Sequence, residues 1–227
     1  MHVAELWRYP VKSMAGERLE EADLGPLGVP GDRELVVVDG AGRILTSRSH
    51  AELLRLRATR DGSGAVRVDG LGWQDPAVAA RVQTVGGPGA RLVRVDGPER
   101  FDIMPLLVTS DGAIAALGVD PRRLRPNLVI GGVPGLEERS WEGRYLAIGD
   151  AVIGLADLRG RCIMTTFDPD TGEQDVNVLR RIRSEFGGRF ALNAWVARAG
   201  RVAVNSPVSL LDRFDQAAPP HLGRFAH

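Results

Sequence analysis

Short apolar runs separated by clusters of turn-forming residues dominate the first half of the chain. Asp39-Gly40-Ala41-Gly42 separates two such runs, and glycine supplies the positive φ that a tight hairpin turn needs. The pattern predicts three hairpins, formed by residues 34–38 with 43–46, 56–60 with 65–68, and 81–85 with 90–94. This spacing favours an antiparallel sheet or barrel, so we predict a mostly β first lobe.

The pattern changes near residue 100. Residues 106–109 form a continuous apolar run, which predicts a buried strand, and a short helix over residues 111–117 follows with Ser110 as its cap. Further strands are predicted at residues 127–130, 190–196, 201–204 and 208–211. The second half therefore combines strands with helices.

Helical spacing is clearest between residues 175 and 187. Apolar side chains recur there at intervals of three and four, which places on one helix face Val176, Leu179, Ile182 and Phe186. The helix is expected to begin near Asp175 and to end at Gly187-Gly188. We predict that it covers the core.

The charge balance excludes some classes of partner. Lysine and arginine together number 29, and so do aspartate and glutamate, which gives a formal net charge of +0. A neutral chain gives no electrostatic reason to expect a nucleic acid or an anionic membrane as partner. The N-terminus shows no secretory signal, and no stretch approaches the roughly 18 apolar residues of a membrane span. We expect a cytoplasmic protein.

Cys162 is the single cysteine, which excludes an internal disulfide and any site that needs several thiolates. The four histidines are too scattered for a zinc motif. A lone cysteine is most often a small buried hydrophobe. Arg159, Arg161, Thr165 and Thr166 surround this one, however, and cations and hydroxyl donors stabilise a thiolate. Such a thiolate would suit a metal whose other donors come from an organic cofactor.

Asp168-Pro169-Asp170-Thr171-Gly172 superficially resembles a calcium-binding loop. Its sixth position is Glu173, where an EF-hand needs glycine, and flanking helices are missing. We interpret the segment as a tight Asx-type turn.

Five short motifs occur in the order and spacing of a known family. They are Tyr9-Pro10-Val11-Lys12-Ser13, Gly31-Asp32-Arg33, Thr46-Ser47-Arg48, Leu124-Arg125-Pro126-Asn127-Leu128-Val129-Ile130, and Arg161-Cys162-Ile163-Met164-Thr165-Thr166 continuing through Asp168-Pro169-Asp170-Thr171-Gly172. Over roughly residues 1–212 the chain resembles MOSC-domain proteins with an N-terminal β-barrel lobe. That group includes the mitochondrial amidoxime-reducing component and its bacterial relatives.

The resemblance implies an α+β, β-rich fold, in which a MOSC-type β-barrel carries a smaller N-terminal β lobe and a few covering helices. We expect an N-terminal MOSC β-barrel-like lobe over residues 1–95 and a MOSC domain over residues 96–213. Residues 214–227 are expected to form a tail.

The resemblance also implies a molybdenum cofactor (Mo-molybdopterin), a pyranopterin dithiolene with a terminal phosphate, bound between the lobes. Cys162 matches the cysteine that ligates molybdenum in the family and is the expected metal ligand and catalytic residue. Asp111 lies where the family has polar residues near the metal and is a second candidate catalytic residue. The residues expected to bind the phosphate and the pterin are Lys12, Ser13, Arg33 and Arg48 from the first lobe, and Ser110, Arg125, Asn127 and Arg161 from the second. Cationic donors suit a phosphate, and a thiolate suits soft molybdenum.

The implied activity is two-electron reduction of N-oxygenated (N-hydroxylated) compounds. The chain has no dinucleotide fingerprint, no flavin motif and too few cysteines for an iron–sulfur cluster, so a separate reductase or ferredoxin-like protein would supply the electrons.

Two alternatives use the same residues. A sulfur-transfer protein would carry a persulfide on Cys162. Lys12 is the only lysine and lies in the cofactor motif, so the sulfur would have to come from a partner. A non-catalytic carrier would bind the molybdenum cofactor without turnover.

Overall fold

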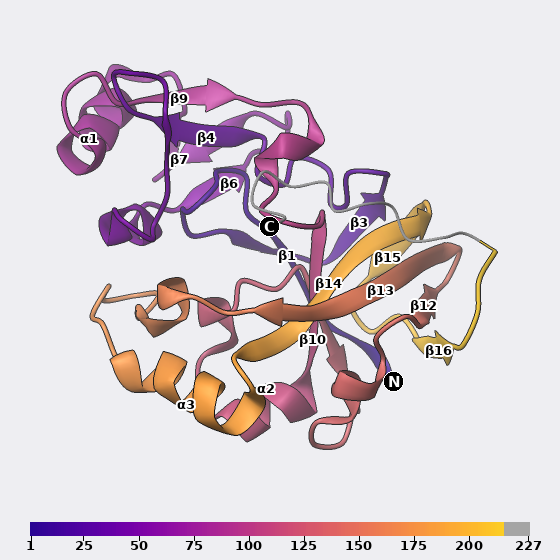
Figure 1. Cartoon of the computed structure of the whole chain (residues 1–227). Helices are drawn as coiled ribbons and strands as arrows, with labels where there is room; N and C mark the ends of the chain where they lie inside the picture. The colour runs from indigo at the N-terminus through magenta and orange to yellow at the C-terminus, as the bar shows by residue number, and fades with distance from the viewer. Residues whose placement is uncertain (216–227) are drawn as a thin grey trace.

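The computed structural model describes residues 1–215 and has a β-rich α+β fold in two lobes (Figure 1). The upper lobe of the figure contains β4 (Leu35–Val38), β5 (Ile44–Leu45), β6 (Ala58–Arg60), β7 (Val66–Val68), β8 (Leu71–Gly72), α1 (Pro76–Gly86) and β9 (Arg91–Arg94). The lower lobe contains one large sheet, on which α2 (Asp111–Leu117) and α3 (Val176–Phe186) pack. The predicted α+β, β-rich class is confirmed.

Eight strands form the large sheet in the order β16-β12-β13-β14-β10-β11-β1-β2. They are β1 (His2–Arg8), β2 (Glu17–Leu19), β10 (Leu106–Ser110), β11 (Leu128–Gly131), β12 (Tyr145–Ile148), β13 (Ala151–Gly160), β14 (Arg189–Arg198) and β16 (Ser209–Leu211). Only β10 and β11 run parallel, and the other neighbours are antiparallel.

Within residues 1–215 the strands do not form a closed ring, so the predicted MOSC-type β-barrel is not a closed barrel. The strand order runs from β16 to β2, and residues 1–3 also form backbone hydrogen bonds with residues 205–208, directly before β16. After β2 the chain leaves the sheet, and β3 (Glu21–Leu24) pairs with β15 (Gly200–Ala203) in a separate two-stranded ribbon.

The small lobe confirms two of the predicted hairpins. The strand β4 pairs with β5, and β6 pairs with β7, both antiparallel. The third hairpin is wrong, because residues 81–85 lie in α1, while β9 pairs with β4 instead. Asp75 accepts a hydrogen bond from the Ala77 N–H, and Pro76 occupies the first helical turn, a combination that starts a helix. Val78 and Val82 are buried on one face of it.

The helices of the large lobe follow the sequence prediction closely. The Ser110 side chain accepts a hydrogen bond from the Ala113 N–H at the start of α2. Asp175 caps α3, which ends at Gly187 with a φ of 65°. Val176 was wrongly predicted to face the core, because its side chain is 51% exposed at the first turn and Val178 is buried instead.

The chain crosses between the lobes more than once. The first strand of the sequence, β1, lies inside the large sheet between β11 and β2, and the next residues build the small lobe. Residues before and after residue 95 thus hydrogen-bond with each other. The predicted division into domains of residues 1–95 and 96–213 stays a prediction. Of the predicted tail, Phe214 packs 5.8 Å from the Tyr145 ring, and residues 216–227 lie outside the described residues.

None of the helices within residues 1–215 is long and apolar enough to cross a membrane.

Candidate functional site

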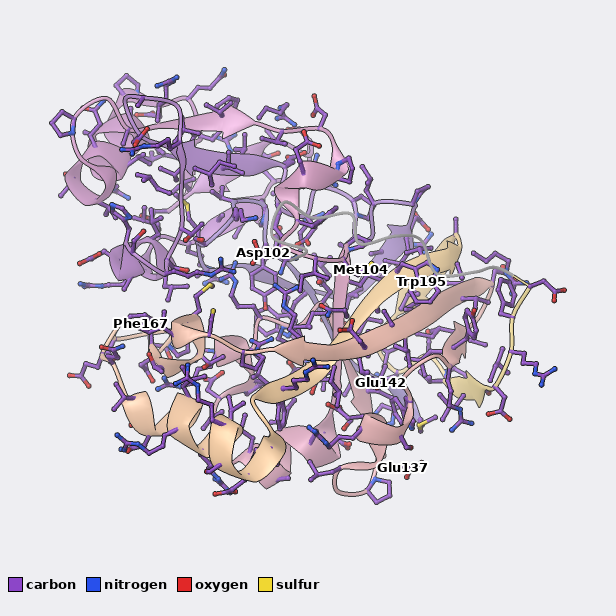
Figure 2. All side chains as sticks on the ribbon, viewed as in Figure 1. Asp102, Met104, Glu137, Glu142, Phe167 and Trp195 are labelled. Carbon is purple, nitrogen blue, oxygen red and sulfur yellow. The ribbon has the colours of Figure 1, made fainter. Side chains whose placement is uncertain are left out.

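A cavity of about 420 Å³ lies between loops of the two lobes. Figure 2 labels Asp102, one of its lining residues, near the middle of the region between the lobes. Loops from both lobes line the cavity. In the first lobe they are the loop after β1, the loop before β4 and the loop between β5 and the next 3-10 turn. In the second lobe they are the loop before β11 and the end of β13 with the residues that follow it. The predicted site residues that line the cavity are Lys12, Ser13, Arg33, Arg48, Arg125, Asn127, Arg161 and Cys162.

Three of these residues hold unusual backbone conformations. Ser13, Arg33 and Arg125 have φ values of 70°, 53° and 57°, in the left-handed region that L-residues rarely adopt. Each such residue costs of order 1–3 kcal/mol, and strained residues cluster at functional sites because the surrounding structure must enforce them. The strain here falls on three loops that present cationic or hydroxyl groups to one cavity.

Asp102 organises the cations on one side of the cavity. Its carboxylate lies 2.7 Å from Lys12 Nζ, 3.1 Å from Arg48 Nη2 and 3.2 Å from Arg159 Nη2. Lys12 also donates to the Arg100 carbonyl at 2.9 Å. Burial raises the pKa of Asp102, but Lys12 and the two arginines outweigh it and hold that pKa at about 2. Asp102 is therefore an anion at neutral pH.

Asn127 fixes Arg33 rather than offering free amide atoms to a ligand. Its Oδ1 accepts hydrogen bonds from the Leu107 N–H at 3.1 Å and from Arg33 Nη1 at 3.3 Å. Its Nδ2 donates to the Trp7 carbonyl and to Asp32 Oδ2. The fully buried Asp32 also forms an ion pair with Arg33. Two polar side chains thus hold one guanidinium at the cavity wall.

Two arginines of the second lobe, Arg125 and Arg161, each have a buried nitrogen atom without a hydrogen-bond partner within residues 1–215. Arg125 lies 4.2 Å above the Tyr9 ring, and burial lowers the pKa of Arg125 to about 10, so it stays charged at neutral pH. Within residues 1–215, Arg125 Nη2 and Arg161 Nε are buried and have no hydrogen-bond partner. Buried donors without partners are costly, and an anion in the cavity would satisfy them.

Cys162 lies at the junction of β13 and the 3-10 turn Ile163–Thr166. Its carbonyl accepts hydrogen bonds from the Thr165 N–H at 3.1 Å and from the Thr165 hydroxyl at 2.9 Å. The thiol is half-buried and lines the cavity together with Arg159 and Arg161. This confirms the cationic surroundings expected from the sequence.

Ser110 and Asp111 are not brought to the cavity. Leu106 and Leu107 line it at one end of β10, whereas these two residues lie at the other end. The Ser110 side chain caps α2, and Asp111 accepts hydrogen bonds from the Gly132 and Val133 N–H groups. The structure thus does not bring these two residues to the predicted site: the Ser110 hydroxyl caps α2, and the Asp111 carboxylate is committed to backbone N–H groups of the loop after β11.

Asp102 and Arg159 are cavity residues that the sequence analysis did not assign. Arg159 had a signal, since it lies three residues before Cys162 and at the end of a strand. No sequence signal marked Asp102, because a single acidic residue before an apolar run belongs to no motif that would indicate a binding site. Asn193 on β14 accepts from Arg159 Nη1 at 3.0 Å and so supports its position.

The donor set suits an anionic cofactor that brings its own metal ligands. Among residues 1–215, no group of three or more His, Cys, Asp or Glu side chains is placed to hold a metal ion. One thiol, several guanidiniums and buried unpaired N–H groups remain at the cavity. This combination fits a phosphorylated cofactor that supplies all but one of the ligands of a soft metal.

Two family models match consecutive parts of the chain. The family model described as "MOSC N-terminal beta barrel domain" matches residues 1–102, and that described as "MOSC domain" matches residues 108–209. Human mitochondrial amidoxime-reducing component 1 is 28% identical, over 92% of this chain and 82% of that protein. A molybdenum cofactor sulfurase of Anopheles gambiae is 27% identical over 87% of this chain and 34% of its own length. The solved structure of the YuaD protein from Bacillus subtilis has 16% identity and a TM-score of 0.47, over 92% of this chain and 94% of that one.

Proposed function

Because the chain belongs to the MOSC family, we propose that its cavity binds a molybdenum cofactor and that the protein reduces N-oxygenated compounds. The observation that carries the proposal is the cavity itself, in which Cys162 lies beside arginines with unpaired buried donors. The relatives named amidoxime-reducing component support the reductase activity at 25–28% identity.

The first-lobe residues Lys12, Ser13 and Arg33 would hold the phosphate and part of the pterin. Arg125 and Arg161 would do so from the second lobe, where their unpaired N–H groups match the acceptors of such a ligand. Cys162 would be the protein's single metal ligand. When bound, the cofactor supplies the two-electron redox chemistry and the site that accepts oxygen from the substrate.

The protein's own groups bind and orient the reactants. Asp102 stays ionised at neutral pH, so it holds Lys12, Arg48 and Arg159 in place rather than donating a proton. The protons needed to release water would then come from solvent at the open cavity. Electrons would come from a separate reductase or ferredoxin-like protein, since the chain carries no redox motif of its own.

Sulfur transfer is the second candidate, because the relative from Anopheles gambiae is named a molybdenum cofactor sulfurase. In that function Cys162 would carry a persulfide received from a partner protein. Both functions depend on Cys162. They differ in the expected molybdenum content of the purified protein, because only the reductase requires bound molybdenum.

The first test is the molybdenum content of the wild-type protein and of Cys162→Ala, produced in a cofactor-competent host. We expect near-stoichiometric molybdenum and pterin in the wild type and about tenfold less molybdenum in the variant, because a metal site that loses a ligand binds weakly. Ser184→Ala, at an exposed position of α3, is the matched control and should retain the metal. Reduction of an N-hydroxylated base with a chemical electron donor then tests turnover.

The absence of metal and pterin from both proteins would contradict the reductase proposal. Persulfide labelling of Cys162 in such a preparation would favour sulfur transfer instead. Stoichiometric molybdenum without reduction of any N-hydroxylated compound would favour a carrier.

A further inference from the structure

A second cavity, of about 290 Å³, adjoins the first. The two share Arg123, Arg125 and Met164 in their walls. Figure 2 labels one of its lining residues, Phe167, at the left of the region between the lobes. The proposed cofactor function makes no use of this space.

Aromatic rings form part of its wall. Trp7 and Tyr9 are stacked with an interplanar angle of 16° and centroids 6.4 Å apart, and Phe167, which follows the 3-10 turn after β13, also lines the cavity. The small residues Ala15 and Gly16 also line it. Flat apolar faces separated by small residues favour a planar aromatic ligand.

Arginines form most of the polar wall, and only some of them are neutralised. Arg122 is held by Asp120 and Asp170, and Arg123 is held by Asp168. The charges of Arg122 and Arg123 are thus neutralised by carboxylates.

The remaining cations of the small lobe in this wall, Arg55 and Arg57, are exposed at the rim of the cavity. Arg55 and Arg57 form no ion pair with any carboxylate of residues 1–215. An excess of guanidiniums in a cavity favours an anion, and phosphate accepts bidentate hydrogen bonds from arginine.

We propose that this second cavity binds a nucleotide, with its base against Phe167 and Trp7 and its phosphate on Arg55 and Arg57. A bare phosphate would leave the aromatic faces without a partner, and an uncharged aromatic ligand would leave the guanidiniums uncompensated. A mononucleotide combines both features. It is either a free nucleotide or the nucleotide half of a dinucleotide form of the cofactor, which would extend past Arg125 from the first cavity.

Titration calorimetry of the full chain with CMP, GMP and inorganic phosphate tests the free nucleotide. We expect one saturable site for a nucleotide, at least about tenfold weaker binding in the double variant Arg55→Gln/Arg57→Gln, and weaker binding in Phe167→Ala. Arg43→Gln, whose side chain is 82% exposed on a hairpin turn outside this wall, is the control and should bind like the wild type. Thermal unfolding of each variant checks that it folds.

Nucleotide released by acid from protein made in a cofactor-competent host tests the second source, and this arm alone rests on the proposed function. Nucleotide in equal amount to pterin identifies the dinucleotide cofactor. Saturable nucleotide binding without released nucleotide identifies a free ligand, even if the protein contains no molybdenum. The proposal is overturned if neither arm detects a nucleotide, if the double variant binds like the wild type, or if phosphate alone binds as tightly as the nucleotides.

Discussion

At the scale of single residues, the half-buried Asp102 and the buried Glu138 are stabilised in opposite ways. Asp102 faces three cations and stays ionised. Glu138, 1% exposed in the 3-10 turn Glu137–Ser140, accepts hydrogen bonds from Ser110 and from the Thr109 hydroxyl, the latter at 3.2 and 3.3 Å. Burial raises the pKa of Glu138 from 4.5 to about 7, and hydrogen bonds only partly oppose this. A buried carboxyl with neutral partners prefers to be protonated.

Stability should therefore fall as the pH rises from about 4.5 to about 7. In this window the folded protein keeps a proton on Glu138 that the unfolded chain has released, so raising the pH favours unfolding. The difference between the two pKa values corresponds to about 3 kcal/mol. Urea unfolding at pH 5 and pH 8 measures it, and Glu138→Gln should remove most of this dependence. Equal pH dependence in the wild type and in Glu138→Gln would contradict the prediction.

At the scale of secondary-structure elements, α1 shows how a local cap outweighs strand propensity. Residues 81–85 were predicted as a strand because they flank the Gly-rich turn Gly86-Gly87-Pro88-Gly89. The Asp75 cap, Pro76 in the first turn and the four-residue spacing of Val78 and Val82 instead select a helix that packs on the small lobe.

Asp75→Ala should destabilise the protein by about 1 kcal/mol, because the Ala77 N–H loses its capping partner. Chemical denaturation measures the loss. Gln83→Ala, at an exposed position of the same helix, should change stability by less than about 0.5 kcal/mol. A loss in Gln83→Ala as large as that in Asp75→Ala would show that the cap does not stabilise α1.

At the scale of the whole molecule, the two lobes are tied together by the path of the chain. The strand β1 lies in the large sheet, the segment after it pairs with β4 through Val11 and Leu35, and Lys12 bonds to Arg100 and Asp102. The shared cavity wall adds contacts between the lobes. Separate unfolding of either lobe would break these links.

We expect the chain to unfold in one cooperative transition. Differential scanning calorimetry should give a ratio of calorimetric to van't Hoff enthalpy of about 1. Val78→Ala, which creates a cavity in the small lobe, should lower the midpoint of the whole transition rather than split it. Two separated transitions in either protein would show that the lobes unfold independently.

The sequence alone determined most elements whose signals are local. Periodicity and caps predicted α2 and α3 with their bounds, turn residues predicted two hairpins, and the Asp168 side chain accepts hydrogen bonds from the Asp170 and Thr171 N–H groups as an Asx turn requires. The five motifs also predicted most of the cavity, because each motif keeps its functional side chains within a few residues of one another.

Only the tertiary structure decided the features that depend on distant partners. Asp102 joins the site because folding brings it to Lys12, Arg48 and Arg159, from three separate segments. Which distant strands pair, such as β3 with β15, is likewise decided by folding, and no local pattern carries that information. Ser110 illustrates the same limit, since its sequence position suits both a cap and a ligand, and only the direction of β10 places it away from the cavity.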